Sequence, residues 1–279
     1  MEETLITRPE HNGDQPMTFV EHLNDLRKHL LRSLFAIVFL AIFFFVFKDY
    51  FFDLIIIKPK QSDFWTNKIL CVLGQKMKIK ELCFEDISLQ LINIDIAGQF
   101  RAHITISLLL GFALAFPYIT LEMWRFVKPA LKKQEARKGR GLIFYVSFLF
   151  VFGVLFGYFI ITPFAINFLG NYVVSTQIQN QINFQSYFST LVSLVFGTGF
   201  VFEIPVLSAF LAKIGIINTK ILKKFRKHAF TVSFVVSAIV TPPDAFSMVL
   251  MALPVYLLYE ISIVVVKRIE KRKFIKIDV

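Results

Sequence analysis

The chain has 279 residues, of which 56% are hydrophobic and 34 are phenylalanine, and its formal net charge is +11. A soluble domain of this length alternates apolar and polar residues, whereas here the apolar residues come in blocks of about 20, the length of a membrane-crossing helix. The composition therefore excludes a soluble globular protein and indicates an integral membrane protein.

Six apolar blocks predict an all-α membrane protein with six transmembrane helices. The blocks cover residues 30–47, 104–123, 142–161, 187–211, 229–240 and 245–266. They form one domain, residues 17–266, between a polar N-terminal tail, residues 1–16, and a basic tail, residues 267–279. The fifth block is so short that its length alone also fits a re-entrant segment. No cleavable signal peptide is expected, because no small residues suited to cleavage follow the first block.

The distribution of charge predicts the topology, because Lys and Arg gather on the cytoplasmic side of a membrane. Three stretches are strongly basic. Residues 125–140 carry seven basic residues and one acid, residues 213–227 carry six and none, and residues 267–279 carry six and two. Residues 48–95 carry seven Lys and seven acids, and residues 165–186 carry no charge. The pattern predicts six crossings with both termini in the cytoplasm. The basic stretches are interpreted as topology signals that contact anionic lipid, not as nucleic-acid sites.

One carboxylate, Glu203, lies inside the fourth apolar block, two residues before Pro205. It precedes Lys213, at the cytoplasmic end of the block, by 10 residues, which places it about 15 Å deep in the membrane. An ionised carboxylate at that depth is costly unless it meets water or a partner, so Glu203 is interpreted as a functional site. A protonated Glu that serves packing alone is the alternative. Pro205 removes one helical hydrogen bond, and Gly197 and Gly199 allow another helix to approach.

Other acidic residues lie at the predicted cytoplasmic ends of the spans. Glu122 and Glu260 are interpreted as packing or ion-pair residues, Glu122 with Arg125. Residues 17–31 follow helical amphipathic spacing, which predicts an interfacial helix that leads into the first span. Asp25 on this helix and Glu135 in the following cytoplasmic loop are rare acids on a basic face. They either recognise arginine or only neutralise their basic neighbours.

The remaining polar residues suggest structural roles. Cys71 and Cys83 lie in the long outer loop, where an oxidising compartment permits either a disulfide or two free thiols. No metal site is predicted, because no His lies near the two cysteines. Asp244 is predicted to cap the sixth helix, and Gly153 with Gly157 to permit close helix contact. Catalytic and cofactor signatures are absent from the sequence, which argues against an enzyme and predicts no cofactor.

Five stretches, taken in order, resemble the TatC family, the multispanning core of the twin-arginine protein translocase. They are "FVEHLNDLRKHLL", "PYITLEMWRFVKPALKKQE", "FGVLFGYFIITPFAINFL", "FGTGFVFEIPV" and "TPPDAFSMVLMALPVYLLYEI". The resemblance covers residues 17–266. It implies a concave, cup-like bundle of six tilted helices in the plasma membrane of a bacterium, an organellar membrane being the alternative.

The resemblance also implies a function and its partners. TatC proteins bind twin-arginine signal peptides of folded cargo and recruit single-span TatA- and TatB-type subunits into an oligomeric complex, with transport driven by the proton-motive force. By position, the residues near the signal site are Asp25, Arg27, Phe126 and Glu135. Glu203 with Pro205 corresponds to the intramembrane polar site for a partner helix. Pro59 and Asp244 match structural positions on the outer face.

The sequence departs from the family pattern at three places. Asp25 stands where the family usually has Glu, Gln99 stands where it tends to have Pro, and the first outer loop is longer by about twenty residues. The chief rival function is a proton-coupled transporter of small solutes with Glu203 as its proton site, although such folds usually carry an internal repeat that is not evident here. A membrane insertase, which would be indifferent to paired arginines, is a further alternative.

Overall fold

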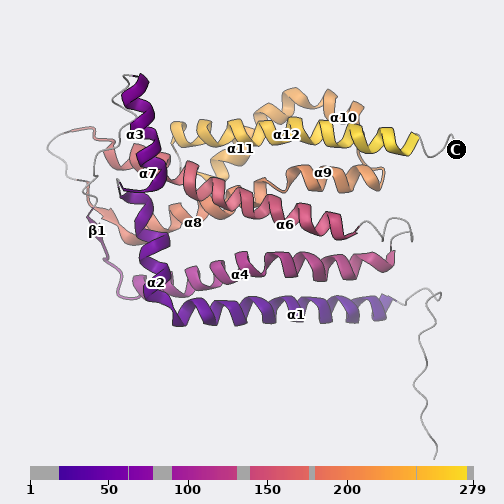
Figure 1. Ribbon diagram of the computed structural model, residues 1–279, viewed down its shortest axis with the longest axis horizontal. Coiled ribbons are helices and arrows are strands. Elements are labelled where there is room, and N and C mark those ends of the chain that lie inside the picture. Colours follow the sequence, from indigo (N-terminus) through magenta and orange to yellow (C-terminus); the bar gives the residue numbers. More distant parts are fainter. Residues whose placement is uncertain are drawn as a thin grey trace, which may run out of the picture.

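The computed structural model describes residues 19–61, 63–77, 90–130, 139–175, 180–242 and 244–274. Long helices lie side by side along one common direction and form the body of the protein (Figure 1). These helices are α1 (Phe19–Val46), α4 (Gly98–Val127), α6 (Gly139–Phe156), α8 (Phe184–Val201), α9 (Ile204–Lys213), α11 (Arg226–Val240) and α12 (Ala245–Phe274). The expected helical architecture is therefore confirmed.

Five stretches are long and apolar enough to cross a membrane, and they match five of the six predicted spans. These stretches are Val20–Val46, Gly98–Val127, Gly141–Asn171, Phe184–Lys213 and Ala245–Lys271. The fifth predicted span corresponds to α11, whose 15 residues reach about 22 Å, less than the about 30 Å of a hydrocarbon core. The first residue of α1 and the last of α12 lie at the same end of the bundle (Figure 1). The sixth crossing and the placement of both ends in the cytoplasm remain predictions.

The first helix differs from the prediction at its beginning. Instead of an interfacial helix that leads into a separate span, α1 runs without a break from Phe19 to Val46. Its sequence contains neither Pro nor Gly, so no residue favours a bend between the amphipathic and the apolar parts. Among the long helices α1 packs chiefly on α4, which places it at an edge of the bundle (Figure 1). Such an edge suits the open, cup-like shape that the resemblance implies.

The long outer loop contains more helix than the sequence analysis expected. Its described parts form α2, a π-helical turn η1, a 3-10 turn η2, and α3: Lys48–Phe52, Asp53–Ile57, Lys58–Lys60 and Trp65–Met77. A short strand, β1 (Leu91–Ile92), pairs in parallel with β2 (Ile182–Asn183) and joins this loop to the segment before α8. These elements form a cap over one end of the bundle (Figure 1). The hydroxyl of Tyr187 on α8 donates to the carbonyl of Ile56 at 2.6 Å and fastens the cap to the bundle.

Small residues allow the central helices to approach closely, as the sequence predicts. A Cβ on Gly153 of α6 would lie 2.9 Å from the Cα of Gly199 on α8. The same helix continues through a π-helical turn, η5 (Gly157–Ile161), into α7 (Thr162–Asn171), and a Cβ on Gly157 would lie 2.9 Å from the carbonyl of Leu194. Any larger side chain would push the two backbones apart. The α6–α8 contact therefore fixes the position of the helix end that carries Glu203.

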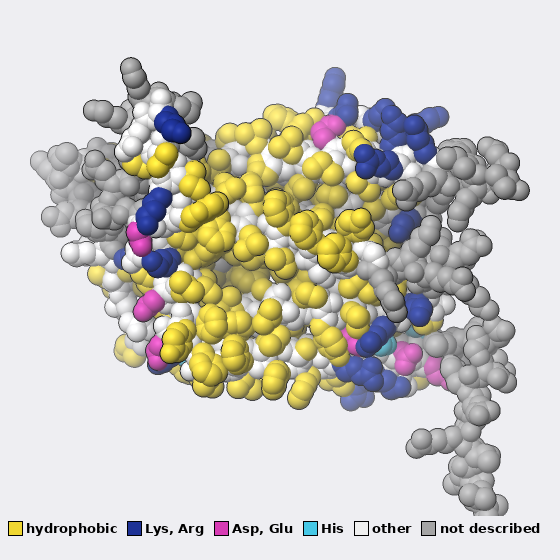
Figure 2. Space-filling model, in the orientation of Figure 1, with side chains coloured by type: hydrophobic (Ala, Val, Ile, Leu, Met, Phe, Trp, Pro, Cys, Tyr) yellow, Lys and Arg dark blue, Asp and Glu magenta, His cyan; other side chains and the backbone are white. Residues whose placement is uncertain are grey.

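The surface divides into an apolar middle and two charged ends. Figure 2 shows hydrophobic side chains over the long helices, with Lys and Arg gathered at the end where α1 begins, and acids mixed with basic residues at the cap. At the cap end, Lys58 pairs with Asp63, and Arg101 in the first turn of α4 pairs with Asp95. The excess of Lys and Arg at one end is what the positive-inside rule expects of a cytoplasmic face. It supports the predicted orientation, with the beginning of α1 on the cytoplasmic side.

Candidate functional site

A buried carboxylate joins the beginning of α1 to the end of α4. The side chain of Glu122 on α4 is fully buried. Its Oε2 accepts from Nδ1 of His29 on α1 at 2.5 Å, and its Oε1 accepts from Nη1 of Arg125 at 2.5 Å. Nη1 of Arg32 lies 3.8 Å from Oε2. The predicted pair with Arg125 is confirmed, and two residues of α1, His29 and Arg32, complete the cluster.

Phe126 lies one turn further along α4 and contacts the same face of α1. Its ring stacks on the His22 ring with 4.4 Å between centroids and makes an edge-type contact with the His29 ring, with 6.4 Å between centroids. Asp25 lies one turn after His22, is half-exposed, and makes an ion pair of 3.5 Å with Lys28. Arg27 is exposed on the same helix. The structure thus brings Asp25, Arg27 and Phe126 to one end of the bundle, while Glu135 lies outside the described residues.

The fourth predicted span is interrupted at Glu203. Helix α8 ends at Val201, and α9 begins at Ile204, with Pro205 buried in its first turn. The amide of Glu203 donates to the carbonyl of Phe200 at 3.1 Å, in the tighter three-residue pattern, and the Glu203 carbonyl accepts from Leu207 at 2.9 Å. Pro205 has no amide hydrogen to continue the α-helical ladder, so the helix breaks where the sequence predicts a disturbance.

The side chain of Glu203 is partly buried. Its Oε1 is buried and has no hydrogen-bond partner in the described part of the chain, and the same holds for the hydroxyl of Ser147 on α6. The preceding residue, Phe202, packs with its Cβ against Gly153. Phe150 of α6 stacks on Phe116 of α4 with 3.7 Å between ring centroids and belongs to the adjacent core. Packing and backbone geometry therefore hold Glu203 in place, and one of its oxygens retains its capacity to accept or share a proton.

The predicted outer-face residues have structural surroundings. Pro59 is fully buried in the 3-10 turn of the cap. Oδ1 of Asp244 accepts from the amide of Ser247 at 2.6 Å, so Asp244 caps α12 as predicted. Cys71 on α3 is part of a disulfide, whereas Cys83, its predicted partner, lies outside the described residues. These positions stabilise the end of the molecule that is remote from Asp25.

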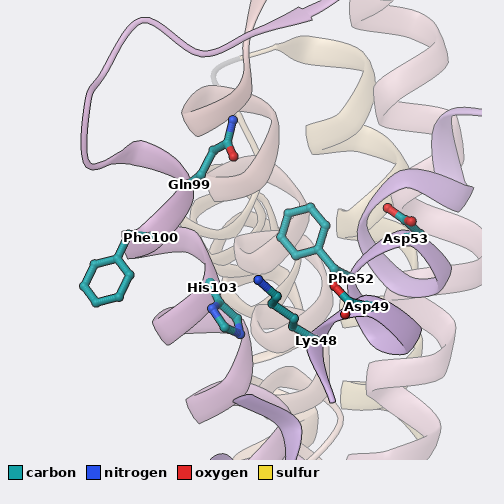
Figure 3. Close-up of a pocket in the computed structure, with 7 residues that line it drawn as sticks. All are labelled: Lys48, Asp49, Phe52, Asp53, Gln99, Phe100 and His103. Atoms are coloured by element: carbon teal, nitrogen blue, oxygen red, sulfur yellow. The ribbon is translucent and has the colours of Figure 1, made fainter. Parts of the chain in front are cut away.

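A recess of about 350 Å³ opens between the first turns of α4 and the cap elements α2 and η1. Its lining combines charged and aromatic side chains, all shown in Figure 3: Lys48, Asp49, Phe52, Asp53, Gln99, Phe100 and His103. Nε2 of His103 lies 3.1 Å from the carbonyl of Phe45, and the two rings stack at 4.0 Å. These contacts hold the first turns of α4 to the last turns of α1. Gln99, which departs from the family pattern, lies in this recess and not near the predicted signal site.

Two further carboxylates form contacts between helices at the basic end. Oε2 of Glu260 on α12 accepts from Nη2 of Arg226 on α11 at 2.6 Å. Glu270 on α12 accepts from the amide of Thr219 at 2.9 Å and also from its hydroxyl, at the start of α10 (Thr219–Lys224). Glu260 therefore has the packing role that the sequence analysis favoured.

The His29–Glu122 contact was not predicted from the sequence, although the sequence contains a signal for it. In two consecutive antiparallel spans, residues at equal distances from the cytoplasmic end lie at equal depth. His29 is at the start of the first apolar block and Glu122 at the end of the second, so they are level with each other. The two residues are 93 positions apart in the sequence, so no local pattern links them.

These observations define a class of protein: a multispanning helical membrane protein with one basic end, a polar cluster at that end and a carboxylate at a helix break. The family model of the Sec-independent protein translocase protein TatC matches residues 21–254. Similar proteins of that name occur in Blattabacterium sp. subsp. Periplaneta americana, at 37% identity over 94% of this chain and 99% of the relative, and in Carboxydothermus hydrogenoformans, at 35% over 94% and 97%.

Solved structures agree with the sequence relatives. Two crystal structures described as the twin-arginine translocase receptor TatC, one of them in DDM, are each 32% identical to this chain. Their TM-scores are 0.65 and 0.70, and the matches cover 88% of this chain and 98% and 99% of theirs. The chain belongs to the TatC family of Sec-independent protein translocase proteins.

Proposed function

We propose that the protein is the receptor subunit of a twin-arginine translocase in a bacterial plasma membrane, with both termini in the cytoplasm. In this proposal it binds the twin-arginine signal peptides of folded proteins at the end where α1 begins. The observation that most supports it is the stacking of Phe126 on His22, one turn from Asp25, at the basic end of a fold similar to solved receptors described as TatC.

The chemistry of the proposed site suits arginine. A carboxylate pairs with the planar guanidinium fork through two parallel hydrogen bonds, which a lysine ammonium cannot reproduce. The side chain of Asp25 is 39% exposed, and its present partner is the more exposed Lys28. An exposed pair of this kind is weak, so an incoming arginine can replace the lysine at little cost. Glu135 supplies the second carboxylate in this proposal.

The proposed partner site is the helix break at Glu203. The buried Oε1 has no partner in the described part of the chain, and such a group is costly until it gains one. A single-span helix of the TatA or TatB type that carries a polar residue would supply that partner within the membrane. Several subunits assembled in this way, driven by the proton-motive force, would then carry the cargo across.

The experiment that tests the receptor function is binding of a twin-arginine signal peptide to the detergent-solubilised protein, with a twin-lysine peptide as the comparison. Tighter binding of the arginine peptide is expected, and the preference should disappear in Asp25→Ala and in Glu135→Ala. Asp49→Ala, at the opposite end, is the matched control and should retain it. Equal binding of both peptides by the wild-type protein would contradict the proposal.

A further inference from the structure

We propose that Glu122 is a positioning residue of the signal-peptide site, which it sets by holding the beginning of α1 against the end of α4. The inference rests on the proposed function, because the site is defined by its preference for paired arginines. It adds a residue that makes no contact with the signal peptide itself. Its role is to fix where Asp25 stands relative to Phe126.

The geometry of Glu122 favours an anchor and not a ligand-binding group. The side chain is fully buried, and each of its oxygens accepts a hydrogen bond of 2.5 Å, one from α1 and one from α4. An incoming guanidinium would have to displace His29 or Arg125 to reach it. Charge-assisted hydrogen bonds of this length are among the strongest in proteins, so the arrangement is well fixed.

A continuous set of contacts leads from Glu122 to the proposed site. His29, held by Glu122, makes an edge-type contact with the Phe126 ring, and the same ring stacks on His22. His22 and His29 are seven residues apart and therefore lie on one face of α1, two turns from each other. Asp25 lies on the helical turns between them. A shift of His29 would therefore move Phe126 and Asp25 relative to each other.

A second contact limits the effect of losing Glu122 to the end of the helix pair. A Cβ on Gly111 of α4 would lie 2.7 Å from the backbone nitrogen of Ala41, so the two helices touch deep in the bundle. Glu122 follows Gly111 by eleven residues, or about 16 Å along the helix. The pair should remain assembled at Gly111 when Glu122 is replaced, while its cytoplasmic ends separate.

The test uses the full-length protein in detergent with the twin-arginine and twin-lysine peptides. Glu122→Ala should lower the preference for arginine by about tenfold, within the range of coupling between residues of one contact network. Glu260→Ala is the matched control, because it removes a carboxylate–arginine pair at the same end between α11 and α12. This control should retain the wild-type preference.

A covalent rescue separates positioning from a general loss of folding. In a variant with His29→Cys and Glu122→Cys, a short bifunctional thiol cross-linker should restore the preference that the unlinked variant lacks. Failure of the cross-link to restore it, or an unchanged preference in Glu122→Ala, would overturn this inference while leaving the receptor function intact. A wild-type protein without preference for arginine would instead overturn the proposed function, and the inference with it.

Discussion

Two glutamates lie inside the helical bundle, and their surroundings differ in kind. The two oxygens of Glu122 accept hydrogen bonds from His29 on α1 and Arg125 on α4, whereas Oε1 of Glu203 is buried without a partner in the described part of the chain. Glu122 is held by hydrogen bonds to two helices, whereas Glu203 lies at a break in the backbone beside Phe202, which packs on Gly153. A carboxylate with all its partners stabilises the fold, and one that lacks a partner is available for an interaction that the chain alone does not make.

The largest expected effect comes from the packing that holds Glu203. Gly153→Leu would place a bulky side chain against Gly199 and Phe202, where even a Cβ is too close. Overpacking of this kind should lower the free energy of unfolding by about 3 kcal/mol. Thermal unfolding in detergent measures it, and Gly141→Leu, where a Cβ meets no atom within 4 Å, is the control. Equal stability of the two variants would contradict the close α6–α8 contact.

The second-largest loss of unfolding free energy is expected when Glu122, the centre of the charged cluster, is replaced. Glu122→Ala leaves the His29 ring nitrogen and the Arg125 guanidinium without their acceptor, but Arg125 is 54% exposed and can turn to water. The expected loss is about 2 kcal/mol, below the about 3–5 kcal/mol of a fully buried pair. Chemical unfolding measures it, and Glu122→Gln should lose less because its amide oxygen still accepts. An unfolding free energy equal to that of the wild type would show that the cluster does not stabilise the helix pair.

Replacement of Glu203 should raise the free energy of unfolding, whereas the two preceding substitutions should lower it. Glu203→Leu removes an unpaired buried oxygen from apolar surroundings and should raise the unfolding free energy by about 1 kcal/mol. The same variant should lose recruitment of a single-span partner, measured by co-purification from membranes. Higher stability together with lost recruitment is expected when the replaced residue destabilises the fold but is needed for binding. A variant that is both less stable and normal in recruitment would contradict the assignment.

The smallest effect is expected at Glu260, whose pair with Arg226 is partly exposed. The two side chains are 29% and 47% exposed, so water screens their attraction. Glu260→Gln should change the unfolding free energy by no more than about 1 kcal/mol. High salt should remove even that difference. A loss as large as that of Glu122→Ala would mean that burial does not distinguish the two ion pairs.

The sequence predicted the elements better than the contacts between them. Apolar block length located five spans, and Pro205 predicted the break beside Glu203, because both features act within a few residues of chain. The helical cap from Lys48 to Met77 was missed, since its short turns lack a periodic pattern and depend on tertiary contacts such as Tyr187 with Ile56. The full cluster of Glu122 was missed for a related reason, because two of its partners come from another helix.

The most direct test of the separate roles of the two glutamates compares Glu122→Gln and Glu203→Gln in two assays on the same membranes. One assay measures the preference for a twin-arginine over a twin-lysine signal peptide, and the other measures recruitment of a TatA- or TatB-type subunit. We expect Glu122→Gln to weaken the first while Glu203→Gln weakens only the second. Loss of signal binding in Glu203→Gln with normal recruitment would contradict the roles given to the two carboxylates.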